Sequence, residues 1–403
     1  MDKVYLGMSG GVDSALSAAL LLEQGFDVHA VYMRNWSKDL PGFHCPWADD
    51  LADAERVAVS LGIDLAVWDC EKEYKETVVD YLLDSYAHGY TPNPDVMCNQ
   101  TVKFGTFAKR AFAEGADYIA TGHYARLASG EKNVCGDDGA RNTTGMAGLP
   151  HGTYFDDASN TTGVAGAMHG SGTSRLMRAT DEHKDQTYFL WRVPGEIFDR
   201  TIFPIGDIPT KAEVRAMCAD RGLGIENKPD SDGICFIGPV GLRTFLLDAF
   251  ERKTGDIIEW ESGKKLGEHD GAFLFTIGQR KGLSVGGGPA HYVVATDTNT
   301  NTVYVTSDPM SAALWTKTMD IVDTHWISGC VPTDGAYTVR TRHTGELRPC
   351  MLTKVSATTM RITYEAPVRT VAPGQSAVFY DGPVCIGGGI IERDEELLAK
   401  FAE

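Results

Sequence analysis

The sequence predicts an α/β fold, with a doubly wound parallel sheet followed by a small α+β domain and a C-terminal β-barrel. Short apolar strands alternate with longer helical segments from Lys3 to about Ala125, which is typical of a parallel sheet covered by helices on both faces. A Gly-Gly turn joins the first strand to the first helix. From about Thr318 the chain holds only short strands and turns, which indicates a small closed barrel.

The N-terminal strands and helices follow one another in the order that such a sheet requires. Strand patterns cover residues 27–33, 64–70 and 117–125. Helical patterns, each closed by a glycine, cover residues 50–62 and 103–115. Ligands of these sheets bind beyond the carboxyl ends of the strands. The turn after Met8 and the segments around Met33 and Gly122 all lie at such ends, so we expect three separate stretches to converge on one nucleotide.

Residues 130–172 interrupt this pattern. Ten glycines fall within these 43 residues, mixed with Thr, Asn, Ala and Asp, and they predict a flexible insertion with little regular structure. Its Cys135, His151 and His169 fit no metal-ligand spacing, so we predict no metal site there.

The second half of the chain predicts two further domains. A helix with the capping box Thr210 and Glu213 begins the central one. Its strand patterns cover residues 256–260, 272–282 and 291–307, and those of the barrel cover residues 337–343, 350–356, 360–365 and 375–391. We therefore divide the chain into residues 1–204, 205–318 and 319–403. In a strand, Arg340 and Arg342 would share one face, which favours either a contact with a phosphate backbone or a solvated barrel face.

Composition limits the function classes. Of the 403 residues 43% are hydrophobic, but no run of about 18 apolar residues occurs, and the N-terminal residues show no basic leader, so we expect a cytoplasmic protein without a membrane partner. The nine cysteines form no C-x-x-C pair, which argues against a zinc site or a cysteine-bound iron–sulfur cluster. A net charge of −18 argues against indiscriminate binding of nucleic acid, so any RNA must contact local basic patches.

The segment "SGGVDS" (Ser9–Ser14) lies at the first strand–helix joint. The unpaired N–H groups of a helix N-terminus and the positive end of its dipole favour phosphate, and Gly10 and Gly11 let the backbone approach it closely. The alternative is an ordinary turn with a polar helix cap.

Two cysteines lie in polar, turn-rich surroundings. Cys98 follows Pro92, Pro94 and Asp95 just before a helix, where a thiolate is favoured, and Cys235 lies in "NKPDSDGICFIG". Taken alone, each is more typical of an inert core cysteine than of a functional one. Two thiols that meet can transfer sulfur or form a disulfide, but the sequence does not show that they meet.

Together these motifs resemble a known family. "SGGVDS" resembles the pyrophosphate loop (PP-loop) of the ATP-pyrophosphatase superfamily, whose fold is that of the adenine nucleotide alpha hydrolases. With "NPDVMCN", "TGHYAR", "KDQTYFL", "DSDGICFIG", "GQRKGL", "PGQSAVFY" and "GGGII", the chain resembles the bacterial tRNA-specific 2-thiouridylases. The similarity runs along the chain in order and fails only across residues 130–172.

The resemblance implies an ATP-dependent transfer of sulfur to the wobble uridine of tRNA. ATP with Mg²⁺ would first adenylate O2 of the uracil, with Asp13 helping to hold the metal on the departing pyrophosphate. The implied nucleotide-binding residues are Gly7, Met8, Ser9, Gly10, Gly11, Val12, Asp13, Ser14, Met33 and Gly122.

The resemblance also implies how sulfur is delivered. Cys235 would carry a persulfide received from a cysteine desulfurase or a sulfur-relay protein, and Cys98 would release the sulfur, leaving a transient Cys98–Cys235 disulfide bond. Asp95 would act as general acid or base.

For tRNA, the resemblance implies contacts to the anticodon loop of Lys, Glu and Gln isoacceptors. The residues are Asn93, Pro94, Asp95, His123, Lys184, Asp185, Gln186, Arg342, His343 and Gln375. His343 stands where the resemblance leads us to expect an aromatic residue. Each has a structural alternative, such as the end of a strand for His123.

Two other functions remain open from the sequence. Another adenylating ligase of the superfamily would share "SGGVDS" but would need no cysteine pair. A redox-sensing nucleotide-binding module would use Cys98 and Cys235 only to switch conformation.

Overall fold

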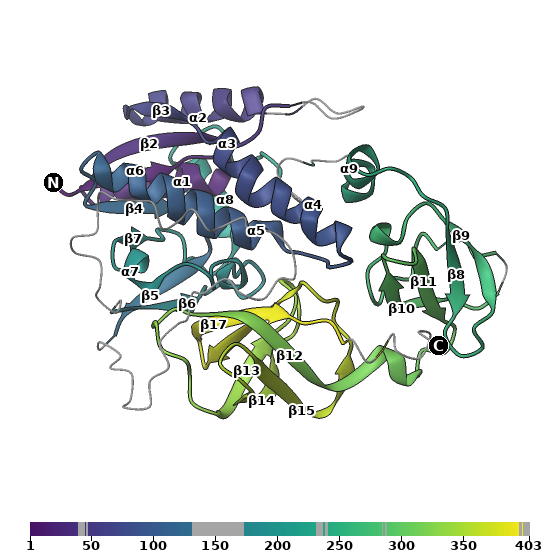
Figure 1. Ribbon diagram of the computed structural model, residues 1–403. Coiled ribbons are helices and arrows are strands. Elements are labelled where there is room, and N and C mark those ends of the chain that lie inside the picture. The colour runs from purple at the N-terminus through teal and green to yellow at the C-terminus, as the bar shows by residue number, and fades with distance from the viewer. Residues whose placement is uncertain are drawn as a thin grey trace.

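The computed structural model of the chain describes residues 1–38, 45, 47–130, 173–230, 237, 241–283, 285–286, 288–394 and 397. Residues 131–172 of the predicted insertion lie outside the described residues, and with them Cys135, His151 and His169. The predicted persulfide carrier Cys235 also lies outside them. Figure 1 shows three sheets: one with helices around it, a barrel below it and a smaller sheet to one side.

The N-terminal sheet is parallel, as predicted. Its strands are β1 (Lys3–Gly7), β2 (Asp27–Arg34), β3 (Leu65–Asp69), β4 (Tyr118–Thr121) and β7 (Thr201–Ile202), in the order β3-β2-β1-β4-β7. The chain runs outward from β1 to β3 and then returns to pair β4 with the other side of β1. Between β1 and β4 the strand order therefore reverses, which is where sheets of this class bind ligands.

Helices cover both faces of this sheet because its strands are apolar on both. Val4 and Leu6 pack in one core and Tyr5, between them, packs in the other. The first face carries α1 (Val12–Glu23), α2 (Trp47–Leu61) and α8 (Lys211–Asp220). The second carries α3 (Glu71–Tyr74), η1 (Lys75–Val79), α4 (Asp80–Ala87), α5 (Pro94–Met97), η2 (Cys98–Phe107), α6 (Ala108–Ala113), η4 (Thr187–Phe189) and α7 (Gly195–Phe198). The doubly wound prediction is confirmed.

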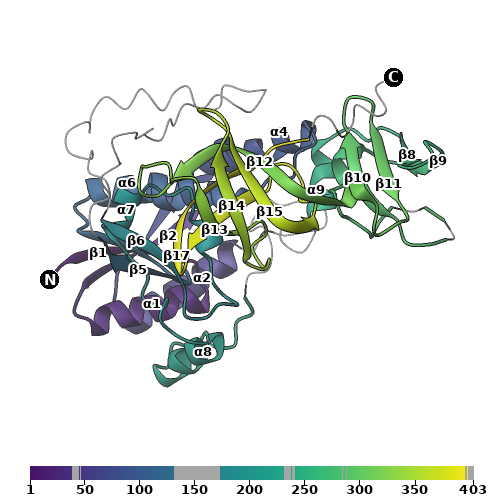
Figure 2. The same ribbon diagram turned by 90° about the horizontal axis from the view of Figure 1, so that it is seen from below.

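Helix α8 packs against α1, although about 190 residues separate the two in the sequence. Its buried Val214 and Cys218 belong to the same core as α1, and Figure 2 shows α8 beside α1. Residues far apart in the sequence thus meet at the start of α1. The domain boundary after residue 204 stays a prediction.

The central sheet is small and mixed. It contains β8 (Gly255–Glu259), β9 (Lys265–His269), β10 (Tyr292–Asp297) and β11 (Thr302–Thr306), in the order β10-β11-β8-β9, and α9 (Leu242–Ala249) precedes it. The strand predicted at 272–282 is wrong. Ala272–Leu274 is a short 3₁₀ helix, η6, and Gly278 and Gly282 adopt positive φ angles that an extended strand does not allow.

The C-terminal strands close into a barrel, as predicted. They are β12 (Trp315–Trp326), β13 (Gly335–Arg340), β14 (Arg348–Lys354), β15 (Met360–Arg369), β16 (Ser376–Asp381) and β17 (Val384–Ile391), after the 3₁₀ turn η7 (Ala312–Leu314). Pairing of β12 with both β15 and β17 closes the ring. The sequence did not indicate β12.

Two strands connect the barrel to the N-terminal unit. β5 (Ala125–Ser129) and β6 (Ser174–Arg178) pair with each other, and β6 pairs with β17. The strand predicted at 117–125 is therefore two strands, because β4 ends at Thr121 and the chain turns there into the barrel sheet. Among the described residues no helix is long and apolar enough to span a membrane.

Candidate active site

The turn between β1 and α1 forms the predicted phosphate-binding loop. Gly10 adopts a φ of +75°, and a Cβ atom there would lie 2.1 Å from the carbonyl oxygen of Asp50, so only glycine fits. Gly11 is the N-cap of α1 and has no side chain to occupy the first N–H groups of the helix. The Ser14 hydroxyl donates to the Gly11 carbonyl over 3.0 Å and lies 3.3 Å from the Ser9 hydroxyl. This loop has the form of an anion-binding helix N-terminus.

The three predicted strand ends meet at this loop. A Cβ atom on Gly7 would lie 3.0 Å from the Cε atom of Met33, and one on Gly122 would lie 2.9 Å from the backbone of Asp13 and Ser14. Gly122 is thus needed because β4 passes directly against the start of α1. The expected convergence is present, and the binding of a nucleotide by these residues stays a prediction.

A network of charged side chains surrounds the loop, and the sequence motifs did not indicate most of it. The Lys211 ammonium lies 2.7 and 2.8 Å from the two carboxylate oxygens of Asp13, and 3.1 Å from Asp230. Lys184 and Arg215 also pair with Asp230, at 2.7 and 2.8 Å. Burial opposes the effect, but hydrogen bonds from Lys184 and Lys211 hold the pKa of Asp230 below its ordinary value. Three cations therefore share one carboxylate.

Lys228 fixes the loop from the other side. Its ammonium donates to the Gly10 carbonyl over 3.0 Å and to Asp50 over 2.7 Å. Lys228 and Asp230 belong to "NKPDSDGICFIG", in which Cys235 is the residue that the sequence predicted to be functional. The phosphate loop and the segment that leads to Cys235 are thus linked by the hydrogen bond from Lys228 to Gly10 and by the ion pairs of Lys211 with Asp13 and Asp230.

Cys98 begins an unusual helix. Asn93 caps α5 by accepting the backbone N–H of Asp95 over 3.2 Å, and Pro94 occupies the first turn. Cys98 then starts η2, a π-helix of ten residues, a rare form that is frequent at functional sites. Cys98 is a buried thiol, 6% exposed. The Cys98–Cys235 pair stays a prediction, because Cys235 is not among the described residues.

Asp95 and His123 lie in surroundings that disfavour charge. Burial raises the pKa of the Asp95 carboxyl, and the nearby Lys103 ammonium lowers it by less. Burial, assisted by Lys103, holds the pKa of His123 well below its ordinary value, so the imidazole is neutral. His123 pairs with the Thr121 hydroxyl at 2.8 Å. Lys103, on η2, is a neighbour of both groups that no sequence motif indicated.

Aromatic rings lie beside the capped turn. The His343 ring lies against the Phe189 ring, with centroids 4.3 Å apart and planes tilted by 33°, and the Tyr188 ring centroid is 6.2 Å from that of His343. The Asn99 side chain donates to the Phe189 carbonyl over 3.3 Å, which ties this cluster to the residue after Cys98. Burial, with a contribution from Arg340, lowers the pKa of His343. His343 therefore joins the Cys98 region, although its contact with tRNA stays a prediction.

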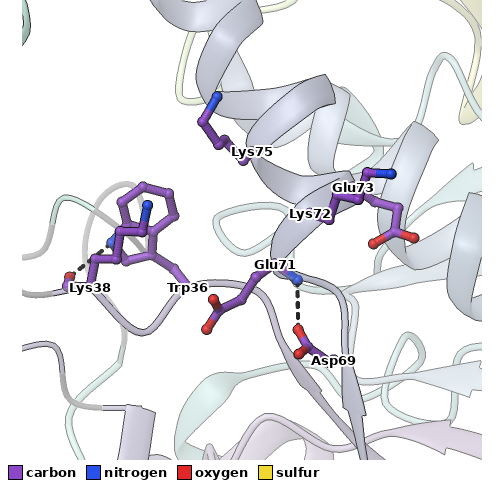
Figure 3. A pocket seen from close by; sticks show the side chains of 7 residues that line it. All are labelled: Trp36, Lys38, Asp69, Glu71, Lys72, Glu73 and Lys75. Atoms are coloured by element: carbon purple, nitrogen blue, oxygen red, sulfur yellow. Dashed lines mark hydrogen bonds between the residues drawn. The ribbon is translucent and has the colours of Figure 1, made fainter.

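A separate cavity of about 530 Å³ opens at the carboxyl ends of β2 and β3 (Figure 3). Its lining residues are Trp36, Lys38, Asp69, Glu71, Lys72, Glu73 and Lys75. Three ammonium groups and three carboxylates balance, so the cavity selects neither sign of charge. None of the residues predicted from the sequence as site residues is among these seven.

Comparison with known proteins covers all three parts of the fold. Family models match residues 2–239 (tRNA methyl transferase HUP domain), 243–307 (tRNA methyl transferase PRC-barrel domain) and 316–391 (Aminomethyltransferase beta-barrel domain). The chain is 38% identical over 398 residues to the tRNA-specific 2-thiouridylase MnmA of Idiomarina loihiensis, covering 97% of this chain and 96% of that protein. It is also 38% identical over 400 residues to the protein of that name from Shewanella putrefaciens, with the same coverage. The chain belongs to the tRNA-specific 2-thiouridylase family.

Family membership confirms the resemblance and leaves the individual tRNA contacts untested. Of the "KDQ" residues, Asp185 is fully enclosed and accepts from Arg340 over 3.0 Å and from the Thr187 hydroxyl over 2.9 Å. Gln186 exchanges hydrogen bonds of 2.9 Å with the backbone of Tyr124. The Asp185 side chain is buried and Gln186 is partly buried, whereas the Lys184 side chain is 41% exposed. In this thiouridylase-family chain, Lys184 is the member of the three best placed to contact RNA.

The barrel residues differ from the sequence expectation. The prediction that Arg340 and Arg342 share a basic face is wrong. Strand β13 ends at Arg340, whose side chain pairs with the buried Asp185, and Arg342 lies exposed in the following turn. The Gln375 amide donates to the Thr91 carbonyl over 2.7 Å, and the Thr91 N–H donates to Pro373 over 2.8 Å. The barrel thus holds the segment that leads to Asn93.

Proposed function

We propose that this chain catalyses the ATP-dependent 2-thiolation of the wobble uridine, U34, in tRNA. The observation that carries the proposal is the full-length similarity, 38% identity across all three domains, to proteins named for that reaction. The geometry supports it, because an anion-binding loop and a cysteine turn belong to one N-terminal unit.

The first half-reaction prepares a poor electrophile. The C2 carbonyl of uracil is amide-like, so its oxygen becomes a leaving group once it attacks the α-phosphate of ATP and expels pyrophosphate. The N-terminus of α1 and the loop hydroxyls bind the phosphate chain and favour the developing charge. Asp13 offers the oxygen ligand that Mg²⁺ prefers, and the metal, when bound, would neutralise charge on the pyrophosphate.

The second half-reaction delivers sulfur. The terminal sulfur of a Cys235 persulfide, received from a cysteine desulfurase or a relay protein, attacks C2 and AMP leaves. The Cys98 thiolate then attacks the Cys235 sulfur and breaks its bond to the transferred atom, which leaves 2-thiouridine and a Cys98–Cys235 disulfide. A thiol reductant from outside the protein regenerates both cysteines.

The desolvated turn around Cys98 suits this chemistry. Burial raises the pKa of Asp95, so its carboxyl keeps a proton to a higher pH than an ordinary carboxyl does, which favours a role as general acid or base. A base that reacts at C2 must leave its stack, which is easiest in a single-stranded anticodon loop. We propose Lys, Glu and Gln isoacceptors as substrates and the cytoplasm as the location.

A reconstituted reaction tests the proposal. The full chain, ATP, Mg²⁺, a cysteine desulfurase with cysteine, a thiol reductant and unmodified tRNA are incubated, and the tRNA nucleosides are analysed by mass spectrometry. We expect 2-thiouridine at position 34, and none with Cys235→Ser. Release of AMP with position 34 left unsulfurated would overturn the proposal and favour another adenylating ligase of the superfamily.

A further inference from the structure

Lys211 reaches the phosphate loop from a distant part of the chain. Its ammonium lies 2.7 and 2.8 Å from the two oxygens of Asp13, the second residue of α1, and its side chain is only 14% exposed. The same ammonium lies 3.1 Å from Asp230. A partly buried ammonium group thus lies directly at the positive end of α1.

The backbone of Lys211 is fixed in this position by several contacts. Thr210 caps α8 by accepting the Glu213 N–H over 3.2 Å, and Asp181 accepts the Lys211 N–H over 3.1 Å. At the other end of α8, Cys218 contacts the Val12 carbonyl at 3.6 Å. The first residue of α8 is therefore held over the first turn of α1 by the packing of the two helices.

The charges around Lys211 suit an anion of more than one charge. Lys184, Lys211 and Arg215 all pair with Asp230, and Lys211 shares itself between Asp230 and Asp13. One carboxylate cannot neutralise three cations, so part of the positive charge of these side chains stays uncompensated. An ammonium with three rotatable donors can exchange one carboxylate partner for a phosphate oxygen without moving its backbone.

We propose that Lys211 is a further ATP-binding residue, whose ammonium binds the phosphate chain at the α1 loop and releases Asp13 when it does so. The ligand class is a polyphosphate: the triphosphate of ATP before adenylation and the free pyrophosphate after it. This inference rests on the proposed function only in taking ATP as the substrate. It adds a residue from α8 to a site otherwise formed by the ends of β1, β2 and β4.

The competing role for Lys211 is that of a counter-ion that only neutralises Asp13. The two roles differ in a double-mutant cycle. Once Asp13 is uncharged, a counter-ion keeps only its pair with Asp230, outside the loop, so Lys211→Met would then leave pyrophosphate binding unchanged. A phosphate ligand keeps its contact with the nucleotide whether or not Asp13 is charged.

The experiment measures binding of inorganic pyrophosphate and of a non-hydrolysable ATP analogue to the full chain by isothermal titration calorimetry with Mg²⁺ present. The proteins are wild type, Lys211→Met, Asp13→Asn, the double variant and Lys211→Arg. The control is Arg221→Met, which breaks an exposed pair with Glu23 at the far end of α8. Thermal unfolding of each variant establishes that it is folded.

We expect Lys211→Met to weaken pyrophosphate binding about tenfold or more, in both the wild-type and the Asp13→Asn background, because a charge-assisted hydrogen bond to phosphate is lost. Lys211→Arg should keep most of the affinity and Arg221→Met all of it. Equal affinities of Asp13→Asn and the double variant would overturn the inference. If the wild-type chain binds both probes but does not thiolate tRNA, the proposed function is refuted, and the role of Lys211 in binding polyphosphate still stands.

Discussion

The phosphate loop and the Cys98 turn belong to one N-terminal unit but handle charge in opposite ways. Around the loop, Asp13, Asp230 and Asp50 are each paired with a lysine, in a partly solvated network. Around Cys98, burial raises the pKa of Asp95 and keeps His123 neutral. On the proposed function the difference separates two tasks: the paired charges around the loop would bind a polyanion, and the buried groups around Cys98 would exchange protons next to an uncharged base.

The largest effect should come from the sulfur chemistry on the desolvated side. Replacing Cys98 by serine should lower thiolation more than about a thousandfold, because a hydroxyl cannot attack the Cys235 sulfur to form a disulfide bond. Release of pyrophosphate in the first turnover, which depends on the loop, should stay within about twofold of wild type. Radiolabelled pyrophosphate release and nucleoside mass spectrometry measure the two steps.

A matched cysteine separates this effect from a general loss of structure. Cys70 is also buried, and burial raises the pKa of its thiol to about 11, so it is inert. Cys70→Ser should leave thiolation within about twofold of wild type. Normal thiolation by Cys98→Ser would show that Cys98 has no chemical role.

The next effect concerns Asp95 and has two parts. Asp95→Asn should lower thiolation about a hundred- to ten-thousandfold, the range for loss of a general acid or base. Since burial raises its pKa, the folded chain binds this proton more tightly than the unfolded chain, and stability falls as pH rises from the ordinary carboxyl pKa through the raised value. The variant should therefore be more stable than wild type at about pH 7 and equal to it at about pH 3.

Asp230, in the charged network around the phosphate loop, should show the opposite pH dependence of stability. Its pKa is held low by the lysines, so its contribution to stability is present above the ordinary carboxyl pKa and is lost as pH falls through the lowered value. Asp230→Asn should thus be less stable than wild type at about pH 7, with the difference vanishing in acid. Urea unfolding across this pH range measures both variants, and shifts of the same sign would refute the contrast between the two regions.

A third test compares two arginines two residues apart. The side chains of Arg340 and Asp185 are 7% and 0% exposed, so Arg340→Met removes the nearer of two arginine partners from a buried carboxylate and should cost about 3 kcal/mol of unfolding free energy. Arg342→Met, at an exposed position, should change that free energy by less than about 0.5 kcal/mol. If Arg342 contacts a phosphate, its loss should reduce the salt dependence of tRNA binding by about one unit of slope. Equal destabilisation by both variants would contradict this assignment.

Local features of the sequence predicted the loop better than the cluster around it. The Gly-Gly turn, the strand ends at Met33 and Gly122, and the proline-flanked turn before Cys98 are contiguous patterns whose physics is short-range. Lys211 comes from about 200 residues downstream, and only the packing of α8 on α1 brings it to Asp13. Arg340 was misplaced for a related reason: a period of two holds only while the strand continues, and β13 ends there.

The smallest effect tests the backbone of the loop with two adjacent glycines. Gly10→Ala places a Cβ atom 2.1 Å from the Asp50 carbonyl at a φ of +75°, so it should cost about 1–3 kcal/mol of stability and weaken ATP binding. Gly11→Ala meets only the Ser9 hydroxyl, at 3.5 Å, with a φ of −96°, and should change stability by less than about 0.5 kcal/mol. Thermal unfolding and calorimetric titration of the ATP analogue compare them. If both alanines were tolerated alike, the close approach of α2 to the loop would not constrain it, and the binding of phosphate would depend on the charged side chains alone.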